Sequence, residues 1–250
     1  MTKGIFIVGT DTDAGKTIVT SGLMHVMRSN GYNATYFKAA LSGAIEVGND
    51  LIPGDTKIVS EVGNLHEDYE NITPYVYRTA VSPHLASKIE EKPININVIK
   101  EKFNYLKEKY DYIIMEGSGG ILCPLIDDEN GIYGLENLIK DLNMSVILVA
   151  RAGLGTINHT VLTVRYMESL GINIKGIIMN NYIDNLLYNN NIEMIEKITK
   201  LPIIGKLENI KNIEGIENVE NINDSMISAI RTYAEKSFNV STLEECMDEL

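Results

Sequence analysis

The sequence predicts one α/β domain over residues 1–250, with a doubly wound, mostly parallel sheet and helices on both faces. Short apolar runs rich in β-branched residues alternate with segments of helical periodicity, which is typical of parallel strands buried on both faces. A chain of 250 residues, 44% apolar and 22% charged, suits a single sizeable core. A glycine-containing loop separates the first apolar run from the first helical segment, as in nucleotide-binding α/β folds.

The alternation places the elements in order along the chain. Strands are predicted at 4–9, 34–39, 111–116, 145–150, 175–180 and 202–205. Helices are predicted at 16–29, 55–63, 82–90, 95–109, 134–142, 157–170 and 189–200. The segment Glu208–Asn223 fits neither period and is predicted to be a surface loop. The acidic segment Ser241–Leu250 is predicted to be a terminal helix turn or a solvated tail.

The segment Gly9–Thr17, Gly-Thr-Asp-Thr-Asp-Ala-Gly-Lys-Thr, predicts a phosphate-binding loop and a P-loop NTPase-like fold. Backbone N–H groups and the following helix start would hold a polyphosphate, with Lys16 adding charge and Thr17 a hydroxyl for Mg²⁺. The usual spacing puts the first glycine at position 10, where this chain has threonine. The alternative is an ordinary exposed turn, but the order strand, loop, helix favours a nucleoside triphosphate site.

Composition excludes several partners. The net charge of −12 argues against a general affinity for nucleic acid or for anionic membranes, since both need clustered basic residues. Cys123 and Cys246 have no metal-ligand spacing, no signal peptide or anchor is visible, and no apolar run reaches the roughly 20 residues of a spanning helix. We therefore expect a cytoplasmic protein.

Two carboxylates are candidate Mg²⁺ ligands. Glu116 ends an apolar strand and precedes Gly117–Gly120, where backbone can approach a ligand closely. Asp55 is as well placed to cap the helix after Pro53 as to bind a metal. Ligand sites of doubly wound sheets lie beyond the carboxyl ends of the strands, so one crevice could collect these groups.

Lys38 ends the second predicted strand, and Ser42 lies in the turn that follows. A lysine at a strand end is usually just solvated. Two lysines near one triphosphate, Lys16 and Lys38, would neutralise charge on a transferring phosphoryl group. Both interpretations remain open from the residues alone.

Together these positions resemble the dethiobiotin synthetases, ATP-dependent ligases of biotin synthesis. The resemblance covers most of residues 1–207. It is carried by Gly-Thr-Asp-Thr-x-x-Gly-Lys-Thr at 9–17, Lys38 with Ser42-Gly43, Asp55, Ser82-Pro83-His84, Glu116-Gly117-x-Gly119-Gly120 and Leu154-Gly155-Thr156-Ile157-Asn158-His159.

The resemblance implies that CO₂ carboxylates one amine of 7,8-diaminononanoate, that the carbamate attacks the γ-phosphate of ATP, and that the second amine closes the ring. It implies a catalytic set, a nucleotide-binding set, a metal-binding set and a substrate-binding set. The catalytic set is Thr12, Lys16 and Lys38, and the metal-binding set is Thr17, Asp55 and Glu116. The nucleotide-binding set is Asp13, Ala14, Gly15, Lys16, Thr17, Ile18, Glu116, Gly119 and Asn180. The substrate-binding set is Ser42, Gly120, Gly155 and Asn158.

The resemblance also implies a homodimer, in which the segment at Gly155 and Asn158 helps bind the substrate carboxylate across the subunit boundary. That segment could instead simply cap a helix. The resemblance also implies that the Asn180 side chain binds the edge of adenine, but Asn180 could instead be an ordinary turn residue. Two departures affect the site: Ala39 replaces the proline that usually follows the second lysine, and Gly205–Glu208 lacks the proline that lies by the adenine.

Three other families of nucleotide-binding protein are alternatives to this one. MinD-like regulatory ATPases carry an extra lysine near the start of the loop, where this chain has Asp11. GTPases carry Asn-Lys-x-Asp, whereas the corresponding strand here is followed by Asn180–Ile183. The amide-forming cobyrinate synthases are longer and contain a glutaminase-like domain.

Overall fold

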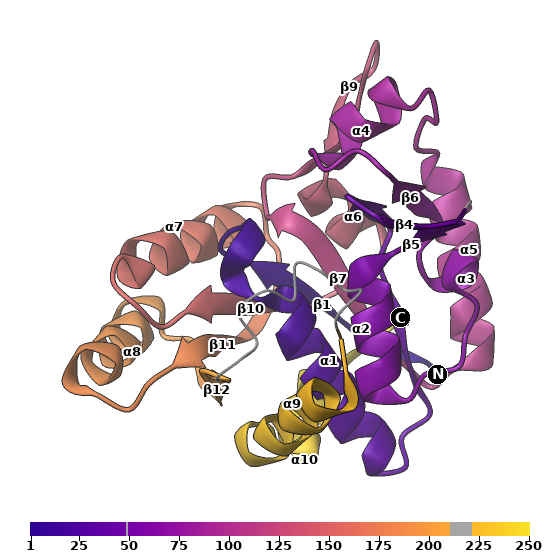
Figure 1. Ribbon diagram of the computed structural model, residues 1–250. Coiled ribbons are helices and arrows are strands. Elements are labelled where there is room, and N and C mark those ends of the chain that lie inside the picture. Colours follow the sequence, from indigo (N-terminus) through magenta and orange to yellow (C-terminus); the bar gives the residue numbers. More distant parts are fainter. Residues whose placement is uncertain (49, 211–221) are drawn as a thin grey trace.

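The computed structural model describes residues 1–48, 50–210 and 222–250. A seven-stranded sheet forms its centre, with strand order β12-β11-β10-β1-β7-β2 and β13 paired to β1 (Figure 1). The strands are β1 (Lys3–Gly9), β2 (Ala34–Phe37), β7 (Tyr112–Gly120), β10 (Val146–Arg151), β11 (Ile174–Tyr182), β12 (Ile203–Glu208) and β13 (Asp248–Glu249). All pairs are parallel except β1 with β13, which confirms the predicted fold class.

The central strands are buried on both faces. Residues 5–8 of β1 and 146–150 of β10 are all fully buried, as their continuous apolar sequences predicted. Phe6 pairs in register with Val146 on one side and with Met115 on the other. The ends of β1, β7, β10 and β11 therefore lie at one edge of the sheet.

Seven helices match the predicted ones to within a few residues. They are α1 (Lys16–Ser29), α2 (Gly54–Gly63), α4 (Pro83–Ile89), α5 (Ile96–Lys109), α6 (Leu135–Asp141), α7 (Thr156–Ser169) and α8 (Leu186–Thr199). The chain moves from β1 toward β2 in one direction and from β10 toward β11 in the other. Because such crossovers are right-handed, α1 and α7 cover opposite faces of the sheet.

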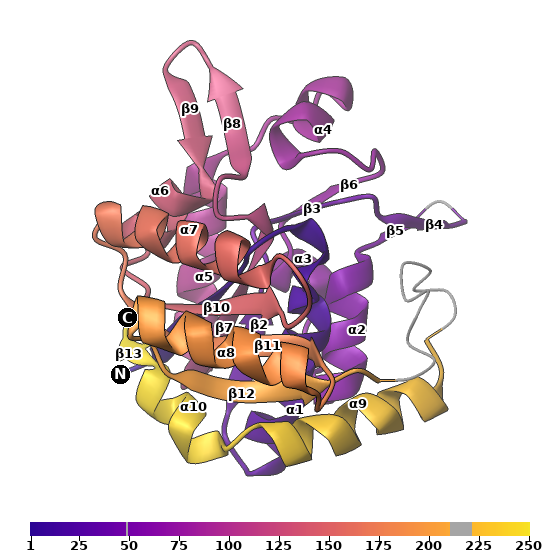
Figure 2. The same ribbon diagram turned by 90° about the vertical axis from the view of Figure 1, so that its left-hand side faces the viewer.

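Other elements were not predicted. A small parallel pair, β3 (Ala40–Ser42) with β6 (Tyr75–Tyr77), follows the second strand. Two hairpins, β4 (Ile45–Val47) with β5 (Asp50–Ile52) and β8 (Pro124–Asp128) with β9 (Gly131–Gly134), lie beyond the sheet, and β8 and β9 project farthest (Figure 2). The short helix α3 (Tyr69–Ile72), the turn η1 (Thr12–Ala14) and the long helix α9 (Asp224–Ser237) complete this set.

The C-terminal prediction was half right. Helix α10 (Val240–Cys246) is present, but the chain then forms β13 rather than a solvated tail. The backbone N–H of Leu250 donates to the carbonyl of Thr2 at 2.9 Å, and the Leu250 side chain packs against Gly4. Both termini therefore lie together (Figure 2).

The predicted surface loop at 208–223 falls mostly on residues 211–221, which lie outside the described residues. Among the helices that the structure describes, none combines the length and the apolar character that crossing a bilayer requires.

Candidate functional site

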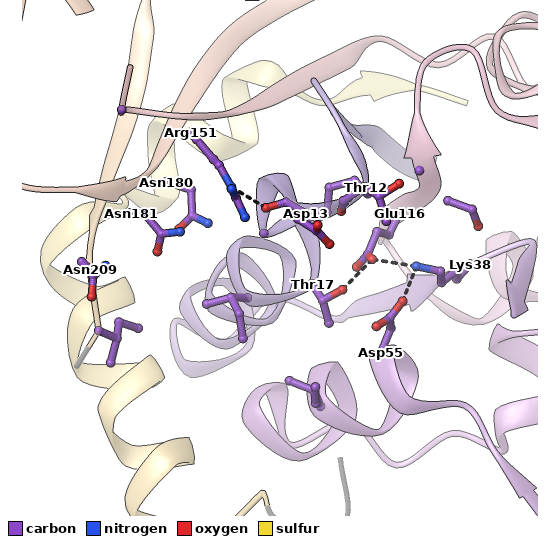
Figure 3. A pocket seen from close by; sticks show the side chains of 18 of the residues that line it. Thr12, Asp13, Thr17, Lys38, Asp55, Glu116, Arg151, Asn180, Asn181 and Asn209 are labelled. Carbon is purple, nitrogen blue, oxygen red and sulfur yellow. Dashed lines mark hydrogen bonds and ion pairs between the residues drawn. The ribbon is translucent and has the colours of Figure 1, made fainter. Parts of the chain in front are cut away.

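A cleft of about 830 Å³ opens where the carboxyl ends of β1, β2, β7, β10 and β11 meet (Figure 3). This is the edge at which doubly wound sheets bind ligands. Of the predicted site residues, twelve line it: Thr12, Asp13, Gly15, Lys16, Thr17, Ile18, Lys38, Ser42, Asp55, Glu116, Gly119 and Asn180.

The predicted phosphate-binding loop runs from the end of β1 to the start of α1. Gly15 precedes α1 with φ of +84°, a left-handed conformation that glycine adopts without strain. A Cβ on Gly15 would lie 1.9 Å from Nδ2 of Asn180, so only glycine fits. No side chain of the described residues caps this end of α1, which leaves its first N–H groups available to an anion.

Lys16 is buried beneath the loop. Its Nζ donates to the backbone carbonyls of Asp11 and Thr12, both at 3.1 Å, so the ammonium lies inside the curve of the loop. Burial, followed by repulsion from Lys38, lowers the pKa of Lys16 to about 8. The lysine is a desolvated cation, which an incoming polyphosphate would stabilise.

Lys38 lies between two carboxylates. Its Nζ is 2.5 Å from Oδ2 of Asp55 and 2.8 Å from Oε1 of Glu116 (Figure 3). The hydroxyl of Thr17 donates to the same Oε1 of Glu116 at 2.9 Å. We call these four residues the carboxylate cluster. The side chain of Glu116 is 0% exposed and that of Lys38 is 5% exposed, so this is a buried ion pair rather than a surface contact.

The pKa values of Lys38 and Asp55 are both shifted by the charges around them. Burial lowers the pKa of Lys38, but the attraction of Asp55 and Glu116 outweighs it and the net pKa is raised. Burial raises the pKa of the Asp55 carboxyl, but Lys38 outweighs this and the net pKa is lowered. The charged forms therefore persist at neutral pH.

These contacts bear on the alternatives that the sequence left open. Lys38 could be solvated or neutralise phosphate charge, and Asp55 could cap a helix or bind a metal. Lys38 is buried and paired, not solvated. Pro53, not Asp55, occupies the N-cap position of α2, and the Asp55 carboxylate faces Lys38. Sequence spacing alone does not show that residues 38, 55 and 116 are in contact; the fold brings them together from the end of β2, the first turn of α2 and β7.

The opposite end of the cleft is lined by amides. The Nδ2 of Asn180 donates to the carbonyl of Ala14 at 3.0 Å, which ties the end of β11 to the loop. Asn181 and Asn209 also line this end (Figure 3). Arg151, to which the sequence assigned no role, lines the cleft too, and its Nε donates to the carbonyl of Asp13 at 2.8 Å.

Four predicted residues lie outside the cleft. Ala14 is a buried residue of the loop itself, and Gly120 pairs with Gly9 between β7 and β1. Gly155 and Asn158 line a separate, mostly apolar hollow of about 460 Å³ beside α7. Leu154 lines both the cleft and this hollow, so the two adjoin.

The donors present fit a hard cation. Thr17, Asp55 and Glu116 supply a hydroxyl and two carboxylates at one place, which suits Mg²⁺ bound jointly with phosphates. Within the described residues, no group of three or more His, Cys, Asp or Glu is arranged to hold a metal by itself.

Known proteins are similar to this chain at two levels. A family model described as an AAA domain matches residues 3–217. The ATP-dependent dethiobiotin synthetase BioD of Clostridium kluyveri is 64% identical over 250 residues, all of both chains. That of Clostridium novyi is 59% identical over 204 residues, 81% of this chain and 86% of the relative.

Solved structures show the same fold at much lower identity. The septum site-determining protein MinD of Pyrococcus horikoshii, complexed with Mg-ADP, has a TM-score of 0.56 and 17% identity, over 94% of this chain and 96% of its own. A ParA family ATPase from Chlorobium tepidum has a TM-score of 0.55 and 14% identity, over 94% and 99%. These likenesses establish the fold alone.

Proposed function

Since the chain belongs to the family of ATP-dependent dethiobiotin synthetases, we propose that its cleft holds ATP and the carbamate of 7,8-diaminononanoate end to end for phosphoryl transfer. The chain is an ATP-dependent ligase that makes dethiobiotin in biotin biosynthesis. The observation that carries the proposed site is the convergence of Lys16 and the carboxylate cluster in one cleft.

The proposed reaction has three steps. One amine of the substrate adds to CO₂ and loses a proton, which gives a carbamate. A carbamate oxygen then attacks the γ-phosphorus of ATP and ADP leaves. Finally the second amine attacks the carbon of the mixed anhydride and loses a proton, phosphate leaves, and the ureido ring closes. No step needs a covalent bond to the protein, so alignment and charge neutralisation suffice.

The residues of the cleft would supply both the alignment of the reactants and the neutralisation of charge. Lys16 would bind the phosphates from inside the loop, where it is already desolvated. Thr12 and Lys38 would lie between the carbamate and the γ-phosphate, and Ser42 would seat the diamine or carbamate. Asn180 would contact the adenine from its place beside the loop.

Thr17, Asp55 and Glu116 would hold Mg²⁺, which supplies further neutralisation of phosphate charge. Lys38 contacts both carboxylates, so its ammonium is held at the end of the cleft where the phosphates would bind. Its own charge then acts on the group that is transferred.

We also propose a homodimer in the cytoplasm. Leu154 and Leu162, 90% and 61% exposed, border the hollow that contains Gly155 and Asn158. Exposed apolar residues beside such a hollow favour a contact between subunits. For the compartment, Cys123 and Cys246 are unpaired thiols, as is usual for proteins of the reducing cytoplasm. Sedimentation at several concentrations tests the dimer, and a monomer throughout would contradict it.

An activity assay tests the function. The purified protein with diaminononanoate, bicarbonate, Mg²⁺ and ATP should yield dethiobiotin, ADP and phosphate, and ADP should form only when the diamine is present. ATP hydrolysis that ignores the diamine, without dethiobiotin, would contradict the proposal and favour a partner-regulated ATPase. Substituting GTP or CTP measures the selectivity of the amide-lined end.

Replacing Gly15 by alanine tests the loop geometry. The added Cβ would collide with Asn180 and strain the loop, so we expect Gly15→Ala to weaken ATP binding by about 100-fold or more. Gly31→Ala is a matched control, because Gly31 has φ of +86° but open space around it. Both variants carry about 1–2 kcal/mol of backbone strain. Equal ATP affinity in Gly15→Ala and Gly31→Ala would reject this account of the loop.

The lowered pKa of Lys16 predicts proton uptake when ATP binds. Above pH 8 the free protein holds Lys16 partly neutral, and bound phosphates raise that pKa again. ATP binding at pH 8.5 should therefore take up protons, and affinity should fall as pH rises through this range. Calorimetry in two buffers of different ionisation enthalpy measures the uptake. A binding enthalpy that is independent of buffer would contradict the prediction.

A further inference from the structure

Arg151 is the last residue of β10, and the proposed mechanism gives it no role. It pairs in register with Asn180 of β11, and the backbone N–H of Ala152 donates to the carbonyl of Asn180. Its Nε donates to the carbonyl of Asp13 in the loop at 2.8 Å. Arg151 therefore lies between the loop and the amide-lined end of the cleft (Figure 3).

Among the described residues, the rest of the guanidinium has no hydrogen-bond partner. Arginine has five N–H donors, and the bond to Asp13 uses only the one on Nε. In the part of the chain that the structure describes, Arg151 forms no ion pair, although Asp13 and Glu208 line the same cleft. Arg151 is exposed, and the end of its side chain lies between Asn180 and the loop (Figure 3).

We propose that Arg151 binds the phosphate chain of the nucleotide, between the loop and the base, with its bond to Asp13 orienting it. The inference rests on the proposed function, since it needs a nucleotide in the cleft. A guanidinium binds phosphate through two parallel N–H donors, and a side chain already oriented through Nε loses little further freedom when it does so. The protein has a net charge of −12, so each cation placed at the cleft counts toward holding a polyanion.

Two substitutions separate this role from mere support of the loop. Arg151→Gln retains a donor for the carbonyl of Asp13 but lacks the charge, whereas Arg151→Ala lacks both. Arg165→Gln is the matched control, because Arg165 is an exposed arginine of α7 that pairs with Glu168. Kd values for ADP and for ATP are measured by calorimetry on the full chain at low and at moderate salt.

We expect Kd for both nucleotides to rise about 10- to 100-fold in Arg151→Gln and in Arg151→Ala. We expect the salt dependence of Kd to become shallower in both variants, because a partly exposed charge has been removed. Arg165→Gln should match the unsubstituted protein. If Arg151→Gln binds as the unsubstituted protein does, in Kd and in salt dependence, Arg151 only supports the loop and the inference is wrong. If the unsubstituted protein binds neither nucleotide, the proposed function fails instead.

Discussion

Lys38→Met is expected to lower turnover by about 100-fold or more, because it removes the cation proposed to lie between the carbamate and the γ-phosphate. It should also lower stability. Lys38 stabilises the buried Glu116 carboxylate, and removing one partner of a buried ion pair costs about 3–5 kcal/mol. The raised pKa of Lys38 predicts the same loss of stability, because folding favours its charged form.

The measurements are kcat, KM for ATP and a thermal melt. Lys88→Ala is the control, because Lys88 pairs with Asp127 at 2.5 Å, as Lys38 does with Asp55, but on the surface. Surface pairs contribute little, so this variant should keep both activity and melting temperature. A folded Lys38→Met protein with undiminished kcat would remove Lys38 from the mechanism.

Lys16→Met is expected to lower turnover at least as strongly, but with the opposite effect on stability. The charged form of Lys16 is disfavoured by folding, since its pKa is lowered to about 8. The unfolded chain therefore binds more protons above pH 8, and the charge costs stability at neutral pH. A neutral side chain of similar length removes that cost, so the melting temperature should stay equal or rise while activity is lost.

The contrast between the two lysines is the informative result. Both variants should lose turnover, yet only Lys38→Met should lose stability. Kd for ATP should rise more in Lys16→Met, because Lys16 lies inside the loop that holds the phosphates. A fall in melting temperature for Lys16→Met, equal to that of Lys38→Met, would contradict the assignment of Lys16 as a desolvated cation.

The sequence predicted the main sheet because its strands are buried on both faces. A run such as Ile5–Val8 has no exposed position, and the helices between such runs keep a clear period. The pair β3 and β6 and the two hairpins are only three to five residues long and partly exposed, so they leave no pattern. β13 was missed because its partner, β1, lies at the other end of the chain.

The site was predictable where one motif contains it. The loop at 9–17 has its residues in sequence and lies between β1 and α1 as expected, although its turn η1 was not predicted. Lys38, Asp55 and Glu116 come from three elements, so only the fold shows that one ammonium contacts both carboxylates. Arg151 directly follows the predicted strand 145–150, at the edge of the sheet where ligands bind, but its contact with Asp13 is visible only in three dimensions.

The most direct test of the mechanism follows oxygen atoms from CO₂. If a carbamate oxygen attacks the γ-phosphorus, CO₂ labelled with ¹⁸O at both positions should pass one label to phosphate and leave one in the ureido carbonyl of dethiobiotin. Exchange with water dilutes both alike, so mass spectrometry should find equal enrichment in the two products. Phosphate without label beside a labelled carbonyl would show that this oxygen never bonds to phosphorus, and would contradict phosphoryl transfer to the carbamate in this cleft.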